Sequence, residues 1–258
     1  MRIQRFAMAS LVALTALELS AVQGTISTGT DSKSGDIKWQ SRTKQYIVSL
    51  KKGSTMIDME IKLGDVVSLD IPKPAGYDKA VAQVEGGQGS SAIGVLAKIV
   101  SEYRMLEWDK PACRYLALAY LAANNAQKAY DECVKVISDD RSAAYTGELA
   151  PAYWQALLKL GKRETLEDLL GKAVASGSRN ASAAALVMRG DILVNDANGS
   201  SDKILAALRD GYLRVALMYT DAECVAERKT AMLKAADCFD QLGQSGRAEK
   251  LRAEAKSI

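Results

Sequence analysis

Four cysteines are the first residues of this chain whose chemistry could matter, and they fall into two pairs. Cys113 and Cys133 are expected on two facing helices, at similar distances either side of the turn between them. In an oxidising compartment they could form a disulfide if their Cα atoms lie about 4.4–6.8 Å apart. Cys224 and Cys238 are expected on one helix, roughly 21 Å apart, which is too far for a bond. The alternative for all four is a small apolar side chain in the core.

The residue types that common hydrolases and metal sites use are missing. The 258 residues include no histidine, which excludes Ser-His-Asp and Cys-His nucleophile systems and every His-ligated metal. No Cys-x-x-Cys motif is present, so neither redox catalysis nor structural zinc is expected. Neighbouring acids such as Asp131 and Glu132 do not share a helix face and are expected to be solvated. We therefore expect no catalytic residue, no metal site and no cofactor.

Two short motifs resemble functional signatures, but each lacks its partner residues. Gly86–Ser91 is a glycine-rich stretch before a helix that could expose backbone N–H groups to an anion. The Gly-Lys-Ser/Thr ending of a phosphate loop is absent. Ser49–Lys52 reads Ser-x-x-Lys, the nucleophile motif of penicillin-recognising enzymes, without their companion motifs. We interpret the first as a turn between helices and the second as a strand running into its turn.

Composition favours a folded, helix-rich protein with no affinity for nucleic acid. Hydrophobic residues make up 48% of the chain, whereas there are only two Phe and four Pro residues. The net charge is +3 and the basic residues are scattered, so no basic face for nucleic acid is expected.

Residues 1–24 have the three parts of a secretory signal peptide. Arg2 and Arg5 charge the start, Phe6–Leu17 is apolar, and small residues follow. Cleavage is expected after Gly24 or after Ala21. The apolar run is shorter than the roughly 20 residues of a membrane span, so we expect an exported, periplasmic or secreted protein with no stable membrane insertion after cleavage. The alternatives are a short amphipathic helix or a retained anchor.

The next two segments are expected to be a linker and a small sheet. Residues 25–35 are small and polar, which predicts a flexible linker. Residues 36–74 alternate apolar and polar positions between short turns, which predicts three or four antiparallel strands. So small a sheet is expected to lean on the first helices or on another chain. Pro72 and Pro74 close this region, because proline cannot continue a strand ladder.

Residues 75–258 are expected to form helices that recur at a fixed interval. The turn residues Gly87, Asn124 and Gly161 are each 37 residues apart. Inner-face residues follow the same spacing, at Ala92, Ala129 and Leu166. Later turns at Gly199 and Gly243 follow at longer intervals, and one helix is expected from about Asp202 to Tyr219.

The central pair of helices, within Lys110–Arg141, resembles the tetratricopeptide repeat. Leu116, Tyr120 and Ala129 match the family's pattern of W-x2-L-G-x2-Y, A-x3-F and P. Four positions differ from the pattern: Cys113, Ala117, Cys133 and Arg141 stand in place of its Trp, Gly, Phe and Pro.

This resemblance, to an exported bacterial type with a small N-terminal β region, implies a mainly α fold. It would be an α-solenoid of about four to five stacked antiparallel helix pairs, preceded by the antiparallel β region. Such arrays usually bind a protein or peptide in a groove along the first helix of each pair. Counting along those helices gives seven candidate groove residues: Arg114, Leu118, Leu121, Gln155, Lys159, Arg189 and Asp191.

We therefore expect a non-catalytic scaffold of the bacterial envelope that binds a protein or peptide of unknown identity. The first alternative is a structural protein that assembles with its own copies through the β region, because exposed strand edges pair readily. The second alternative is a hydrolase whose nucleophile the motifs do not reveal.

Overall fold

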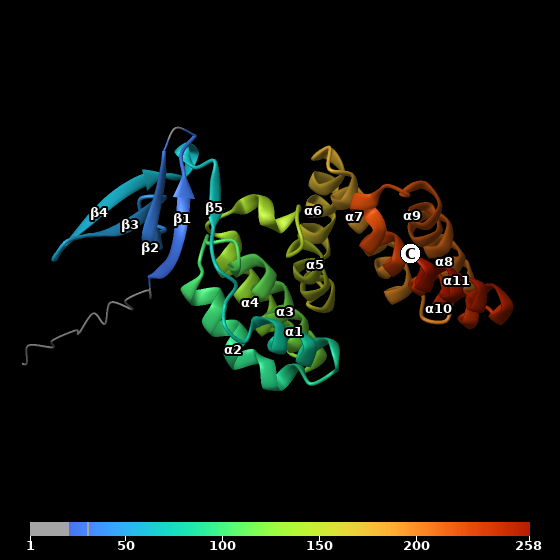
Figure 1. Cartoon of the computed structure of the whole chain (residues 1–258). Coiled ribbons are helices and arrows are strands. Elements are labelled where there is room, and N and C mark those ends of the chain that lie inside the picture. The colour runs from blue at the N-terminus through green and yellow to red at the C-terminus, as the bar shows by residue number, and fades with distance from the viewer. Residues whose placement is uncertain (1–20, 30) are drawn as a thin grey trace, which may run out of the picture.

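A computed structural model describes residues 21–29 and 31–258, and it places a sheet at one end of a row of helices (Figure 1). The predicted signal peptide lies almost entirely outside the described residues. Within the described part of the chain, no helix combines the length and apolar character needed to cross a membrane.

The sheet has five antiparallel strands in the spatial order β4-β3-β2-β1-β5. Their bounds are Val22–Ser27 for β1, Ser32–Gln40 for β2, Gln45–Lys52 for β3, Thr55–Lys62 for β4 and Ser68–Asp70 for β5. The linker predicted for residues 25–35 is therefore wrong, because those residues belong largely to β1 and β2.

Small polar residues hold β1 and β2 together, which is why their sequence looked like a linker. The hydroxyls of Thr25 and Ser34 lie 2.8 Å apart across the two strands, as do those of Ser27 and Ser32. Such hydroxyl pairs stabilise a sheet without apolar side chains. Of the described residues in the predicted linker, only Ile26 is fully buried.

One face of the sheet packs against the chain that follows the second helix. Ile37, Val48 and Ile61 point into this core, together with Trp39 and Tyr46. The partners from the helical part are Met105 and Leu106, which lie just after the helix Gly89–Glu102. The Tyr46 hydroxyl donates a hydrogen bond to the Met105 carbonyl at 2.9 Å, and Trp108 Nε1 donates one to the Ile71 carbonyl at 2.9 Å. The sheet thus packs against the first part of the helical region, as expected for so small a sheet.

The helices follow one another along the chain as paired elements. The first three pairs are α1 (Tyr77–Glu85) with α2 (Gly89–Glu102), α3 (Asp109–Ala122) with α4 (Ala126–Ile137), and α5 (Ala150–Lys159) with α6 (Arg163–Ala175). In the fourth pair, α7 (Arg179–Asn195) packs against α8 (Ser201–Ala206), a π-helical turn (Ala207–Tyr212) and α9 (Leu213–Met218). The last pair is α10 (Val225–Gln241) with α11 (Ser245–Ser257).

The predicted turn residues all occupy the left-handed backbone region that ends a helix. Gly87, Gly161, Gly199 and Gly243 have φ between 68° and 85°, and Asn124 has φ 56°. Glycine and asparagine tolerate this conformation best, and each of these residues lies just after the end of the first helix of a pair.

The first helix of each pair also contacts the first helix of the next pair. Thus α1 contacts α3, α3 contacts α5, α5 contacts α7, and α7 contacts α10. Five elements from different pairs therefore lie side by side and form one continuous side of the helical row. The single helix expected from Asp202 to Tyr219 is not regular, since the π-helical turn interrupts it.

Candidate functional site

A cavity of about 380 Å³ opens on the side formed by the first helices. Its walls come from α3, α5, α7 and α10, with a contribution from the segment before α5. It lies where two hydrophobic cores meet, one extending from α1 to α7 and the other from α7 to α11. Four helices that are far apart in the sequence therefore enclose one site.

Four of the seven predicted groove residues line this cavity: Arg114, Leu118, Gln155 and Asp191. Whether they contact a partner stays a prediction.

Leu121, Lys159 and Arg189 do not line the cavity. The lining of the cavity ends at Leu118 on α3 and at Gln155 on α5, and Leu121 and Lys159 lie about one turn further along these helices. On α7 the lining positions follow the helical period, with Ala184, Val187 and Asp191 among them. Arg189 falls on another side of that helix, because residues two apart do not share a helix face.

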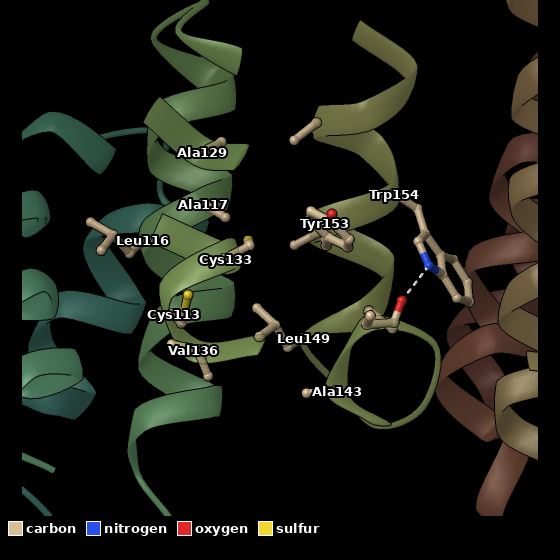
Figure 2. Close-up of a cluster of buried hydrophobic side chains, with 14 of the residues drawn as sticks. Cys113, Leu116, Ala117, Ala129, Cys133, Val136, Ala143, Leu149, Tyr153 and Trp154 are labelled. Carbon is tan, nitrogen blue, oxygen red and sulfur yellow. Dashed lines mark hydrogen bonds between the residues drawn. The ribbon is translucent and has the colours of Figure 1, made fainter. Parts of the chain in front are cut away.

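The apolar wall of the cavity is built around Trp154. Tyr153 and Trp154 point to opposite sides of α5, Tyr153 toward the α3–α4 pair and Trp154 away from it (Figure 2). The Trp154 side chain is 1% exposed, and its Nε1 donates a hydrogen bond to the Ala144 carbonyl at 2.8 Å. Val187 and Met188 of α7 complete this wall. Trp154 thus fixes the segment before α5 and also lines the cavity.

Two ion pairs lie in the cavity wall. Arg114 Nη1 is 3.6 Å from Glu148 Oε2, and Lys234 Nζ is 2.8 Å from Asp191 Oδ1. The Tyr212 hydroxyl also donates a hydrogen bond to Asp191, at 2.6 Å. Burial, followed by the charge of Asp191, raises the pKa of Tyr212 well above its ordinary value, so the phenol stays protonated as a donor. The charge of Asp191 is therefore paired with that of Lys234, and its carboxylate has a structural role.

Glu227 is the remaining acidic residue of the cavity, and it lies in the first turn of α10. Its side chain is half-buried, and its enclosed Oε2 has no hydrogen-bond partner among the described residues. Burial raises the pKa of the Glu227 carboxyl, although its own backbone N–H and the charge of Arg114 oppose the rise.

Sequence reasoning missed Glu148, Trp154, Glu227 and Lys234 as cavity residues. Trp154 was recognisable only as a core residue. Glu227 and Lys234 belong to the fifth pair, whose register the irregular spacing after Gly161 did not reveal. No local motif marks these positions as neighbours of α3.

The cysteines lie in the core, away from the cavity lining. Cys113 of α3 and Cys133 of α4 are fully buried free thiols, and Figure 2 shows their sulfur atoms at the interface of the two helices. A hydrogen bond with Cys133 and burial raise the pKa of the Cys113 thiol. A disulfide between them stays a prediction. Cys224 and Cys238 are also buried free thiols.

Across residues 21–29 and 31–258, no group of three or more Cys, Asp or Glu side chains is placed to hold a metal ion. The cavity offers an apolar wall, two internally paired cations and one unpartnered carboxylate oxygen. Such a surface can hold apolar and polar parts of a ligand together.

Comparison with known proteins does not assign this chain to a family. No family model matches the chain, and no curated protein matches its sequence. Two solved structures are similar to it: crystal structures of a putative kinesin light chain from Podosopora anserina with nearly identical TPR-like repeats, one of them carrying a single substitution. They are 15% and 16% identical, cover 71% of this chain and 92% of their own, and have TM-scores of 0.41 and 0.40.

Proposed function

We propose that this protein is a non-catalytic scaffold that binds a protein or peptide partner in the cavity between α3, α5, α7 and α10. The observation that carries the proposal is the cavity itself, because four first helices from successive pairs each contribute side chains to it. Helical arrays resembling tetratricopeptide repeats bind their partners through a composite surface of this kind. The lining of the cavity also combines apolar side chains with charged groups, which suits a peptide better than a wholly apolar ligand.

We assign no reaction to the cavity. Its two basic side chains are each bonded to an acid, and the chain has no histidine that could serve as a general base.

We also propose that the protein is exported and acts in the periplasm or outside the cell. The support is the charged and apolar pattern of residues 1–24. Of the two cleavage positions, the one after Ala21 is compatible with a complete β1, because this strand begins at Val22. Cleavage after Gly24 would remove the first half of the strand.

A selection from a random twelve-residue peptide library on the purified protein tests the scaffold proposal. Peptides recovered from the library are expected to lose at least tenfold in affinity for a Gln155→Trp variant, because the indole would occupy space in the cavity. Fluorescence anisotropy with labelled peptides measures this change.

Lys159→Trp provides the matched control. Lys159 is exposed on the same helix, about one turn from Gln155, and does not line the cavity. Its variant is expected to bind the selected peptides within twofold of the original protein. A library that yields no peptide, or peptides that bind Gln155→Trp unchanged, would refute the proposal.

Assembly with other copies is a second candidate, favoured by strand β4. This strand pairs with β3 alone and forms an edge of the sheet. Met56 and Ile57 on it are 52% and 42% exposed, so both backbone and apolar side chains are available to another strand. We expect a rise in mass with concentration in size-exclusion chromatography with light scattering, abolished by Ile57→Lys. A constant monomer mass would eliminate this candidate.

A further inference from the structure

We infer that the cavity accepts a basic side chain, lysine or arginine, of the bound peptide and that Glu227 is the group that bonds its cation. This inference rests on the proposed function and specifies the ligand chemistry of the same site.

The charge balance of the cavity is the first support. Its charged lining residues are three acids and two bases: Glu148, Asp191, Glu227, Arg114 and Lys234. Arg114 is paired with Glu148 and Lys234 with Asp191. The lining therefore has one more acid than it has bases, and Glu227 is the acid that forms no ion pair with either base. A positively charged ligand group complements this excess.

The environment of Glu227 is the second support. Its Oε2 is enclosed and has no donor among the described residues, whereas buried polar atoms in native proteins nearly always have one. Burial raises the pKa of Glu227, whereas its position in the first turn of α10 favours the ionised form, because the N-terminal end of a helix carries partial positive charge. The terminal torsion of a glutamate is soft, so either oxygen can turn toward a ligand in the cavity. A donor supplied by the ligand would satisfy an oxygen that the protein leaves unpartnered.

The apolar part of the cavity lining favours a long basic side chain over a small cation. Val187, Met188 and Trp154 contribute apolar side chains to the same cavity as the charged groups. Lysine and arginine have aliphatic stems that pack on such a surface while the charged end reaches a carboxylate.

The test uses the same peptide library on the original protein and on Glu227→Gln. Peptides selected by the original protein are expected to be enriched in Lys or Arg at one position. In the tightest peptide, that residue is then replaced by norleucine, which keeps the stem and removes the charge. The replacement should weaken binding to the original protein about 10- to 100-fold and binding to Glu227→Gln less than about threefold.

Glu249→Gln serves as the control, because Glu249 is exposed on α11, outside the cavity. The norleucine replacement in the peptide should weaken binding to Glu249→Gln as much as it weakens binding to the original protein. The Glu227→Gln variant is expected to fold, since it replaces a half-buried charged group by a neutral group of the same shape.

Different results would refute the inference about Glu227 and the scaffold proposal. Peptides that bind and are sensitive to Gln155→Trp, but show no enrichment in Lys or Arg or tolerate norleucine equally in both proteins, would overturn this inference and leave the scaffold proposal standing. A library that yields no peptide would overturn both.

Discussion

Replacing Gly211 by alanine is expected to lower the free energy of unfolding by about 2–3 kcal/mol. Gly211 lies in the π-helical turn where this segment crosses α7. A Cβ atom at this position would be 2.9 Å from the Cα atom of Gly190 and 3.1 Å from the carbonyl oxygen of Leu186. Both neighbours are backbone atoms, so rotation of a side chain cannot relieve the overlap and the two segments must separate.

Gly171→Ala is the matched control for this prediction. Gly171 is an exposed residue within α6, and a Cβ atom there has no neighbour within 4 Å. Alanine should therefore stabilise the protein by about 0.5–1 kcal/mol, because it restricts the unfolded chain and favours the helix. Urea unfolding followed by circular dichroism measures both variants. Equal effects of the two substitutions would show that the Gly190–Gly211 contact does not constrain the fold.

This glycine contact also explains an error in the sequence prediction. The helix expected from Asp202 to Tyr219 has the correct extent, but it is broken by a π-helical turn at the position of Gly211. A hydrophobic period cannot reveal such a break, because the cause is the close approach of two backbones that are distant in the sequence. Gly190 is equally uninformative in isolation, although a Cβ there would come within 2.5 Å of the Tyr212 ring.

The turns between helices were predictable because their cause is local. A left-handed residue after a helix favours glycine or asparagine, whatever the helix packs against. Gly87, Asn124 and Gly161 therefore revealed the pairs from the sequence alone. By contrast, β1 and the first half of β2 were missed because small residues and hydroxyl pairs replace the apolar alternation there.

The cavity was only partly predictable for a related reason. Helical periodicity identified the side of α3 and α5 that faces the cavity, which gave Arg114, Leu118 and Gln155. It could not show how far along each helix the cavity extends, so Leu121 and Lys159 were included. The contribution of Glu227 depends on the packing of α10 against α7, and the repeat spacing did not predict the length of the part of the fourth pair that lies between them in the sequence.

Trp154→Ala is expected to cost about 3–5 kcal/mol of unfolding free energy, the largest effect of any substitution in the cavity wall. The indole is 1% exposed and packs where α5 meets the segment before it. Alanine would leave a hole in the core. It would also leave the buried Ala144 carbonyl without the donor that Trp154 supplies. The midpoint of urea unfolding measures the loss.

Trp154→Phe separates the two contributions. Phenylalanine keeps most of the apolar contact but cannot donate to Ala144, so we expect a loss of about 1–3 kcal/mol from the unsatisfied carbonyl. A loss as large as that of Trp154→Ala would mean that the hydrogen bond, and not the packing, holds the segment before α5 in place. No loss in either variant would show that Trp154 does not anchor this segment.

These variants also connect stability with binding at the same wall. Trp154→Ala removes a side chain that both supports α5 and lines the cavity, so unfolding free energy and peptide affinity should fall together. Gln155→Trp changes the adjacent residue, which is only half-buried, and should reduce affinity while leaving the unfolding midpoint nearly unchanged. If peptide affinity were lost only in variants that are also destabilised, the cavity would be a by-product of helix packing and not a binding site.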